Sequence, residues 1–385
     1  MRVKNRFTLA AATVAVSAAA VAGVAASPLA QAQPPGVFVG GFHHISTIAS
    51  TIPGNGDVNP YGVAVVDHSE GKLVKGNILV SNFNNKLNQQ GTGSTIVSIS
   101  PSGQVSLFAQ ISPIGLRCPG GVGLTTALSI LPNGWVVVGS LPTTGGNPAT
   151  AKAGCLIVLN SSGRVVTTFS GHGINGPWDM TAVTFGNVAE LFVTNVLNGT
   201  VEAALREGID PSTTPGPIVD GGTVLRLLVT TPRFGTPQLL SSTMIGSRFA
   251  ERTDPNALVI GPTGVDLNRH GELYVADTLG DRIGGIPDAL FRLHSDLTGC
   301  TVSIHGWLKG PLGLVVAPND DILTVNGGNG YLVETRPDGH QVARVLLDHT
   351  GSPPGAGALF GLALVPHDTG VYFVNDNTNT LNLLH

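Results

Sequence analysis

The chain has little cysteine, little charge and few aromatic residues. Of its 385 residues, 3 are cysteine and 3 are methionine, while 11% are charged and 5% are aromatic. Three cysteines without a CxxC spacing give no indication of a zinc site. With 20 basic against 24 acidic side chains, a nucleic-acid partner is not expected. Glycine is abundant instead, with 52 residues, which is typical of a chain with many turns and closely packed strands.

Several motifs are missing as well. The sequence has no glycine-rich loop of the phosphate-binding kind and no GxSxG motif. After the first 32 residues, no apolar run is long enough to span a membrane. These absences argue against nucleotide hydrolysis, against the chemistry of a nucleophilic serine on a strand-to-helix turn, and against a membrane span in the mature chain.

The first 32 residues have the pattern of a secretory signal peptide. Three basic residues precede an alanine-rich apolar run that ends at Ala26, and Ala30-Gln31-Ala32 is a small-x-small cleavage site. A retained membrane anchor is the alternative. We therefore expect a signal peptide over 1–32, a short linker over 33–39, and one domain over 40–385. The mature protein is expected to be a monomer that is periplasmic or secreted.

Six segments of the chain share one pattern of strand, turn and strand. In the clearest, Gly264 opens an apolar strand, a polar turn follows, and a second strand ends at Asp277. The other five begin at Gly62, Gly121, Asp179, Gly313 and Gly361. A third strand is expected after each hairpin, for example over 289–293 in the fourth repeat, and a fourth strand follows. Repeats of four antiparallel strands predict an all-β protein, a six-bladed β-propeller.

The last repeat ends one strand short. Leu381 to Leu384 is its third strand, and the chain stops at His385. Residues 42–48, before the first repeat, alternate like a strand. We predict that they pair with 381–384 as the outer strand of blade six, which closes the ring and leaves no open edge there.

Two of the three cysteines are placed to form a disulfide. Cys118 lies just before the inner strand of blade two, and Cys155 begins the third strand of the same blade. Alternating strand directions bring both positions to one end of that blade. We predict a Cys118–Cys155 disulfide and a free Cys300; three reduced thiols are the alternative.

The repeats resemble those of the NHL family. The match is closest at 273–278, LYVADT, and at 281–283, DRI, and the resemblance covers essentially residues 40–385. In the other blades Asn or Ser140 stands in place of Asp277. The resemblance implies a six-bladed propeller, a scaffold that serves enzymes, binding proteins and interaction platforms alike.

A candidate site lies at one mouth of the central channel. The second strand of each blade ends on this face, and the connections to the third strands are expected to be long in blades one to four. Polar residues predicted at this mouth are Asn82, Asp179, Asn195, Asp277, Asn326 and Asn375. The alternative is that these side chains cap turns after their strands. Tyr61, Trp178 and Phe360 precede the inner strands, where they either stack under a ligand or pack between blades.

Amide and carboxylate oxygens together suit Ca²⁺ or another divalent ion. The arrangement resembles gluconolactonase-like propellers, in which a divalent ion polarises a lactone carbonyl. That resemblance implies metal ligands at four of the positions: Asp179, Asn195, Asp277 and Asn326. His172 and His305 lie shortly before inner strands. A histidine base beside a bound ion would resemble streptogramin lyase; loop histidines without a catalytic role are the alternative.

Two main functions follow from this pattern. The first is a secreted propeller that binds a small molecule or an extracytoplasmic protein on the face with the long loops of blades one to four. The second is a metal-assisted lactone hydrolase or lyase with its site at the channel mouth. The lack of a complete catalytic motif favours the first, and a purely structural envelope protein is a third possibility.

Overall fold

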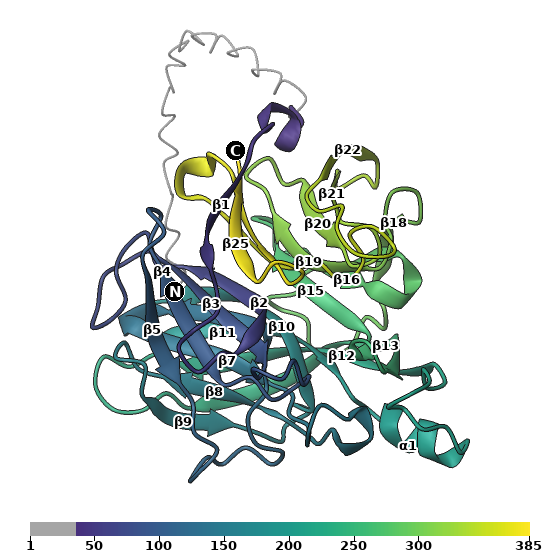
Figure 1. Cartoon of the computed structure of the whole chain (residues 1–385), viewed down its shortest axis with the longest axis horizontal. Coiled ribbons are helices and arrows are strands. Elements are labelled where there is room, and N and C mark those ends of the chain that lie inside the picture. The colour runs from purple at the N-terminus through teal and green to yellow at the C-terminus, as the bar shows by residue number, and fades with distance from the viewer. Residues whose placement is uncertain (1–35) are drawn as a thin grey trace, which may run out of the picture. The chain divides into compact units, whose positions relative to one another are not determined.

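The computed structural model of the protein describes residues 36–385, which form six antiparallel β-sheets (Figure 1). The inner strand of each sheet packs against the inner strands of both neighbouring sheets, and the first packs against the last. The predicted six-bladed propeller is therefore confirmed. The predicted signal peptide, residues 1–32, lies outside the described residues.

The strands of blades one to three are ordered from the channel outward. Blade one contains β2 (Val58–Val65), β3 (Ile78–Asn84), β4 (Thr95–Ile99) and β5 (Val105–Gln110). Blade two contains β6 (Leu124–Leu131), β7 (Trp135–Ser140), β8 (Cys155–Leu159) and β9 (Val165–Phe169). Blade three contains β10 (Gly176–Phe185), β11 (Val188–Val196), β12 (Val219–Thr230), β13 (Leu239–Asp254) and the short β14 (Leu258–Ile260).

Blades four to six follow the same order. Blade four contains β15 (Pro262–Leu267), β16 (Leu273–Asp277), β17 (Arg282–Ile286) and β18 (Cys300–Ile304). Blade five contains β19 (Pro311–Val316), β20 (Ile322–Asn326), β21 (Tyr331–Thr335) and β22 (Gln341–Leu346). Blade six contains β23 (Leu359–Leu364), β24 (Val371–Asn375), β25 (Thr380–Leu384) and β1 (Ile45–Ser50). One α-helix, α1 (Thr200–Arg206), lies in the connection between β11 and β12.

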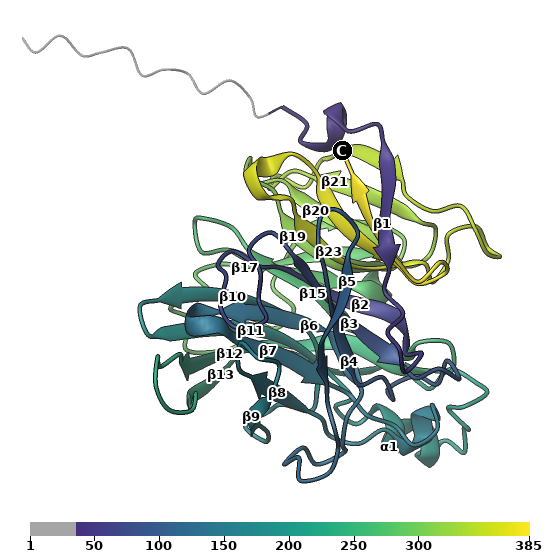
Figure 2. The same ribbon diagram turned by 60° about the vertical axis from the view of Figure 1, so that its left-hand side comes forward.

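The ring is closed by the two ends of the domain. β1 pairs antiparallel with β25, with Ile45 opposite Leu384 and Ser50 opposite Thr380, and the two strands lie side by side in Figure 1 and Figure 2. The predicted closure of blade six by an N-terminal strand is confirmed. The strand begins three residues later than expected because Phe42 packs into the apolar core between blades five and six.

The predicted third strand of blade four is wrong. Residues 289–293 form a turn, and the strand is β17, which pairs with β16 along its whole length. Its sequence, RIGGI, holds two glycines, which lower strand propensity and hide the strand from pattern analysis. An added Cβ at Gly285 would lie 2.8 Å from Glu272 Oε1, so a larger residue there would require that side chain to move. As a consequence, the connections between second and third strands are long only in blades one to three.

Glycines allow the inner strands to approach one another closely. A Cβ added at Gly313 would lie 1.9 Å from the backbone oxygen of Phe360, and one added at Gly361 would lie 2.1 Å from that of Tyr61. Contacts this short leave no space for a side chain. Gly62, Gly264, Gly313 and Gly361 are therefore a packing requirement of the ring, whereas Gly121 lies before β6 and an added Cβ there meets nothing within 4 Å.

Hydroxyl groups connect one blade to the next. Ser81 Oγ, in blade one, donates a hydrogen bond of 2.8 Å to the Thr125 carbonyl of blade two. Thr194 Oγ1, in blade three, donates one of 2.7 Å to the Thr263 carbonyl of blade four. Both bonds are buried, so each satisfies backbone polar groups that the packing of the blades removes from water.

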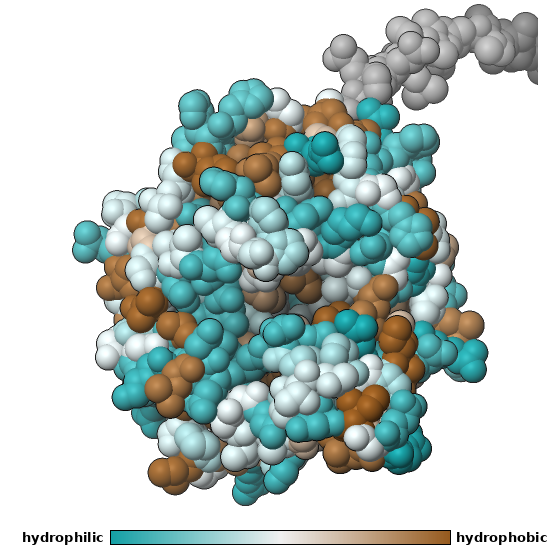
Figure 3. All heavy atoms as spheres, turned by 45° about the vertical axis from the view of Figure 1, so that its right-hand side comes forward, coloured by the Kyte–Doolittle hydropathy of each residue, from teal (hydrophilic) through white to brown (hydrophobic). Residues whose placement is uncertain are grey.

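Separate apolar cores lie between the blades. Between blades one and two, Leu79 and Ile96 pack with Val136 and Ile157. The predicted disulfide joins Cys118 and Cys155 at the edge of this core, and Cys300 is free and exposed. On the face shown in Figure 3, apolar residues are scattered among hydrophilic ones. Within residues 36–385, no helix has the length and apolarity needed to cross a membrane.

Candidate functional site

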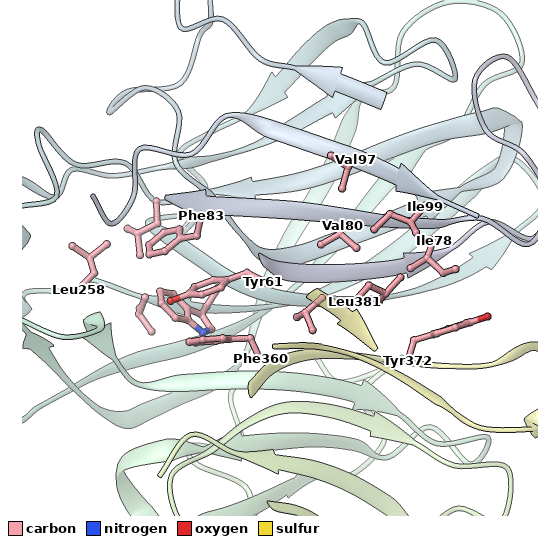
Figure 4. Close-up of a cluster of buried hydrophobic side chains, with 14 of the residues drawn as sticks. Tyr61, Ile78, Val80, Phe83, Val97, Ile99, Leu258, Phe360, Tyr372 and Leu381 are labelled. Carbon is pink, nitrogen blue, oxygen red and sulfur yellow. The ribbon is translucent and has the colours of Figure 1, made fainter. Parts of the chain in front are cut away.

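An aromatic cluster closes the channel at the face where the inner strands begin. The Tyr61 ring is stacked between those of Phe83 and Phe360, at centroid distances of 4.5 and 3.9 Å (Figure 4). Trp178 meets Phe83 edge-on at 5.9 Å. The space between Trp178, Phe360 and the inner-strand glycines is too small for a water molecule. The interpretation of these aromatic residues as packing between blades is confirmed, and we call the four rings the aromatic plug.

The long loops pack onto the aromatic plug. Leu141 follows β7, Leu197 follows β11, and Leu258 begins β14; all three join the apolar cluster that contains Tyr61. Gln90, in the loop of blade one, donates a 2.6 Å hydrogen bond from Nε2 to the Asn256 carbonyl. These loops therefore cover the mouth at which the sequence placed a ligand groove.

The central cavity opens on the opposite face. Its volume is about 410 Å³, and its walls are formed by residues of all six inner strands together with Asp67, which follows β2. A second cavity of about 640 Å³ lies beside it, over blades one to three. The two share Asp67, Ile130 and Ala182, so they form one continuous hollow. A space of this size and depth suits a small molecule.

Two carboxyl groups stand in the wall of the central cavity. Asp179 lies on β10 and Asp266 on β15, and each is half-buried because the cavity leaves one side accessible to water. Asp266 Oδ1 accepts a 2.7 Å hydrogen bond from Thr181 Oγ1, and Oδ2 accepts one of 2.8 Å from the Val316 N–H. Asp179 Oδ1 accepts a 2.8 Å bond from the Met180 N–H. The inner strands of blades three, four and five thus hold the pair in position.

The environment changes how these carboxyl groups titrate. Burial raises the pKa of Asp179 to about 8; the Met180 hydrogen bond opposes the rise, and the negative charge of Asp266 adds to it. Burial also raises the pKa of Asp266, against the lowering effect of its bonds to Val316 and Thr181. At neutral pH Asp179 therefore holds its proton and can donate a hydrogen bond into the cavity.

Two hydroxyl groups in the same wall lack protein partners. Thr126 is 7% exposed and Ser129 is 8% exposed, and both line the central cavity. Neither hydroxyl takes part in any of the side-chain hydrogen bonds formed within residues 36–385. Neither oxygen is among the fully buried side-chain atoms that lack a partner, so both hydroxyls face the open cavity and are available to a molecule there.

The predicted asparagines hold the chain segments that enter their own blades. Asn82 Nδ2 donates to the Thr51 carbonyl before blade one, at 3.1 Å. Asn195 and Asn326 accept hydrogen bonds from the backbone N–H groups that precede blades three and five. Asn375 Nδ2 donates to Asp348 before blade six. All four are buried, and none lines the central cavity.

The two predicted aspartates have different surroundings. Asp277 forms a 3.0 Å ion pair with Arg282 on the neighbouring strand, and both side chains are buried. Asp179 is the one member of the predicted set that lines the central cavity. The structure therefore does not gather the four proposed metal ligands at one point.

The two predicted histidines lie in exposed turns away from the cavity. His172 accepts a hydrogen bond at its backbone oxygen from Ser242 Oγ, and His305 does so from Gln341 Nε2. Both have positive φ, 53° and 58°, which is typical of turn positions. Neither lines the central cavity or the one beside it.

The residues of the cavity wall do not fit a calcium cage. Ca²⁺ takes six to eight oxygen ligands, whereas this wall offers two neighbouring carboxyl groups, and Asp266 already accepts three hydrogen bonds. Over the described part of the chain, no three His, Cys, Asp or Glu side chains gather as metal ligands. The wall therefore does not supply the ligand set that a calcium-dependent step requires.

Pattern analysis missed Asp266, Thr126 and Ser129. Asp266 occupies the same place in blade four as Thr181 in blade three, two residues after the repeat start in each case. Asp266 could have been found by comparing the six inner strands position by position. In blades one, five and six this place holds Ala64, Val315 and Ala363, so the charge stands out.

Comparisons with solved structures show similar folds. A protein from Thermus thermophilus described as an oxidoreductase (glucose dehydrogenase) aligns with a TM-score of 0.54 and 14% identity over 89% of this chain and 99% of that one. A gluconolactonase from Xanthomonas campestris aligns with a TM-score of 0.52 and 12% identity over 88% of each chain. A streptogramin B lyase aligns with a TM-score of 0.48 and 15% identity over 89% and 97%.

At sequence identities this low, the structural likeness shows a similar fold and leaves the activity of this chain open. No family model matches the chain, and no curated protein matches its sequence. The NHL resemblance thus has no support from a family match. The conclusion is that this chain is a six-bladed β-propeller and that a gluconolactonase is among its structural neighbours.

Proposed function

We propose that the protein binds a small polar molecule in its central cavity, which the molecule enters from the face opposite the long loops. The observation that carries this proposal is the pair of carboxyl groups, Asp179 and Asp266, in a wall that also presents unpartnered hydroxyls. Perturbed carboxyl groups in a cleft are typical of functional sites.

The mouth on the long-loop face is closed, which also favours entry of the ligand from the other face. The aromatic plug leaves no room for water between its rings and the inner strands. A ligand at that mouth would have to displace apolar side chains of three loops and of the aromatic plug, which packing holds in place. For the cellular compartment we keep the expectation from the signal-peptide pattern of residues 1–32, and we propose a secreted or periplasmic monomer.

The test uses two variants that add the same bulk on opposite faces. Ala182→Trp places an indole where the two cavities meet, and Thr213→Trp places one on an exposed loop at the long-loop face. Ligand-observed NMR with a panel of small metabolites identifies binders to the wild type. We expect Ala182→Trp to lose them and Thr213→Trp to keep them; the reverse would assign binding to the long-loop face.

The second candidate is a hydrolase or lyase acting on a lactone or similar carbonyl compound. It is favoured by the pKa of Asp179, which burial raises to about 8 and so into the range where a carboxyl group transfers protons near neutral pH. Asp179→Asn is expected to lower the rate of such a reaction by about 10²–10⁴-fold. Turnover of lactone substrates that survives both this substitution and chelation of divalent ions would contradict the assignment.

A further inference from the structure

We infer that the molecule bound in the central cavity carries a positively charged amine, which Asp179 and Asp266 receive. This inference rests on the proposed function and adds the chemical class of the ligand. It starts from the charges in the hollow. The lining of the central cavity contains three titratable side chains, all acidic: Asp67, Asp179 and Asp266.

The neighbouring cavity has the same character. It adds His68 and Glu70 to the lining, and neither cavity is lined by a lysine or an arginine. An anionic ligand such as a phosphate or a carboxylate would find no lysine or arginine there and would be repelled by whichever of the carboxyl groups are ionised. Anions are therefore the ligand class least suited to these cavities.

The pair of carboxyl groups lacks a counter-charge. Asp179 and Asp266 bond to backbone N–H groups and to Thr181, all of them neutral donors. The buried Glu251 and Glu334 likewise accept hydrogen bonds from backbone N–H groups, whereas Asp277 has a cation, Arg282, at 3.0 Å. An ammonium group beside Asp179 supplies the missing charge and has three donors to offer.

Hydroxyl groups complete the site for the rest of the ligand. Thr126 and Ser129 are more than nine-tenths buried, line the cavity and have no hydrogen-bond partner within the described residues. They suit the uncharged polar part of a small amine. The cavity of about 410 Å³ has room for a short diamine or a single sugar ring and continues into the neighbouring cavity.

Binding of a cation requires Asp179 to release its proton. Because burial raises the pKa of Asp179 to about 8, the group is protonated below that pH and ionised above it. The affinity for an amine should therefore rise about tenfold per pH unit up to about pH 8 and then level off. A neutral ligand that accepts a hydrogen bond from protonated Asp179 would show the opposite trend.

The experiment compares three probes of equal length and different charge. These are 1,4-diaminobutane, 1,4-butanediol and succinate, with calcium chloride as a separate arm for an inorganic cation. Titration calorimetry at pH 6, 7 and 8 measures their affinities for the full mature protein. At pH 7, heats in buffers of different ionisation enthalpy count the protons released.

We expect the diamine to bind at least tenfold more tightly than the diol or succinate at pH 8, with close to one proton released per ligand at pH 7. Asp179→Asn should weaken diamine binding by at least tenfold. The matched control is Asp210→Asn, which removes the same charge from an exposed loop and should leave affinity unchanged.

Each other outcome overturns the inference in its own way. Binding of the diol as tight as that of the diamine, and sensitive to Asp179→Asn, would assign a neutral ligand and leave the proposed function standing. Calcium binding that depends on Asp179 without diamine binding would assign a metal ion. Absence of binding by every probe would contradict the inference, while the metabolite panel with Ala182→Trp tests the proposed function separately.

Discussion

The ring of Tyr61 lies 3.9 Å from that of Phe360, centroid to centroid, and this stack joins the first blade to the last, its neighbour in the ring. The two residues are almost 300 positions apart in the sequence, yet each stands directly before an inner-strand glycine. The stack closes one mouth and leaves the cavity open at the other, so it decides which face can receive a ligand.

Replacing Tyr61 by alanine should destabilise the ring. Its side chain is 2% exposed, and truncation of a buried aromatic residue typically costs about 3–5 kcal/mol in free energy of unfolding. Tyr61→Phe keeps the stack and should cost at most about 1.5 kcal/mol, the contribution of one hydrogen bond. Urea unfolding of both variants measures the difference. Equal losses for the two would mean that the hydroxyl, and not the stack, holds the aromatic plug together.

The close approach of blades five and six predicts a cost for a single methyl group. An alanine Cβ at Gly313 would lie 1.9 Å from the Phe360 carbonyl oxygen, so the backbone must move. We expect Gly313→Ala to lower the free energy of unfolding by about 1–3 kcal/mol. Gly54→Ala is the control, because an added Cβ there meets nothing within 4 Å. Thermal unfolding that shows equal midpoints for the two variants would contradict the packing argument.

The buried carboxyl group of Asp179 predicts how stability varies with pH. In the unfolded chain it ionises near pH 3.8, whereas in the folded protein burial raises its pKa to about 8. The unfolded state therefore loses this proton first, and the free energy of unfolding falls as pH rises from about 4 to about 8. Asp179→Asn should flatten the curve in this window.

Two comparisons distinguish the contribution of Asp179 to this pH dependence from the contributions of other acidic residues. Burial raises the pKa of Glu251 to about 8 as well, so some slope should remain in the variant. Asp210→Asn is the control: the hydrogen bonds from Ser212 lower the pKa of Asp210, so it contributes only at more acidic pH. Urea titrations between pH 5 and 8 provide the curves. A variant curve parallel to that of the wild type would place the proton elsewhere.

The disulfide in blade two should contribute measurably to stability. It links Cys118 and Cys155 over a separation of 37 residues, and removal of such a bond typically costs about 2–4 kcal/mol. The double substitution of both residues by serine tests this in denaturant. Cys300→Ser should change stability by less than about 0.5 kcal/mol, because that thiol is exposed and free. A reducing agent should shift the wild type and leave the double variant unchanged.

Substitution of Asn326 distinguishes a structural role of this residue from a metal-binding role. Its side chain bonds to the Lys309 N–H, the Trp307 carbonyl and Asn329, so Asn326→Ala removes three part-buried hydrogen bonds and should cost about 1–3 kcal/mol. Affinity for any ligand of the central cavity should change less than about twofold, since distant sites act independently. Loss of a tightly bound divalent ion, measured by elemental analysis, would restore the metal interpretation.

The repeats could be found in the sequence because each blade builds its strands from contiguous residues. Gly62, Gly264, Gly313 and Gly361 mark inner strands, and the strand-ending Asn82 and Asn326 mark second strands; these local signals gave the blade number and the closing strand. The local signals failed at β17, because Gly284 and Gly285 are residues typical of a loop. There, pairing with β16 along the whole strand outweighs local propensity.

The candidate site was less accessible to such reasoning. The repeated Asn residues looked like a ring of ligands, but each one is used by its own blade to hold the chain segment that enters it. Asp179 stood out because it replaces a glycine. Asp266 did not, because its importance depends on Thr181 and Val316, which belong to the two neighbouring blades.

The sequence by itself determined the six repeats, the strand that closes the ring and the disulfide, because these depend on the order of residues and on short-range periodicity. Only the tertiary structure decided which mouth is open and which polar groups face the cavity. Those features arise where six inner strands meet around one axis. There the packing of Tyr61, Phe83, Trp178 and Phe360 fills one end of the channel, and the carboxyl groups of two adjacent blades meet at the other.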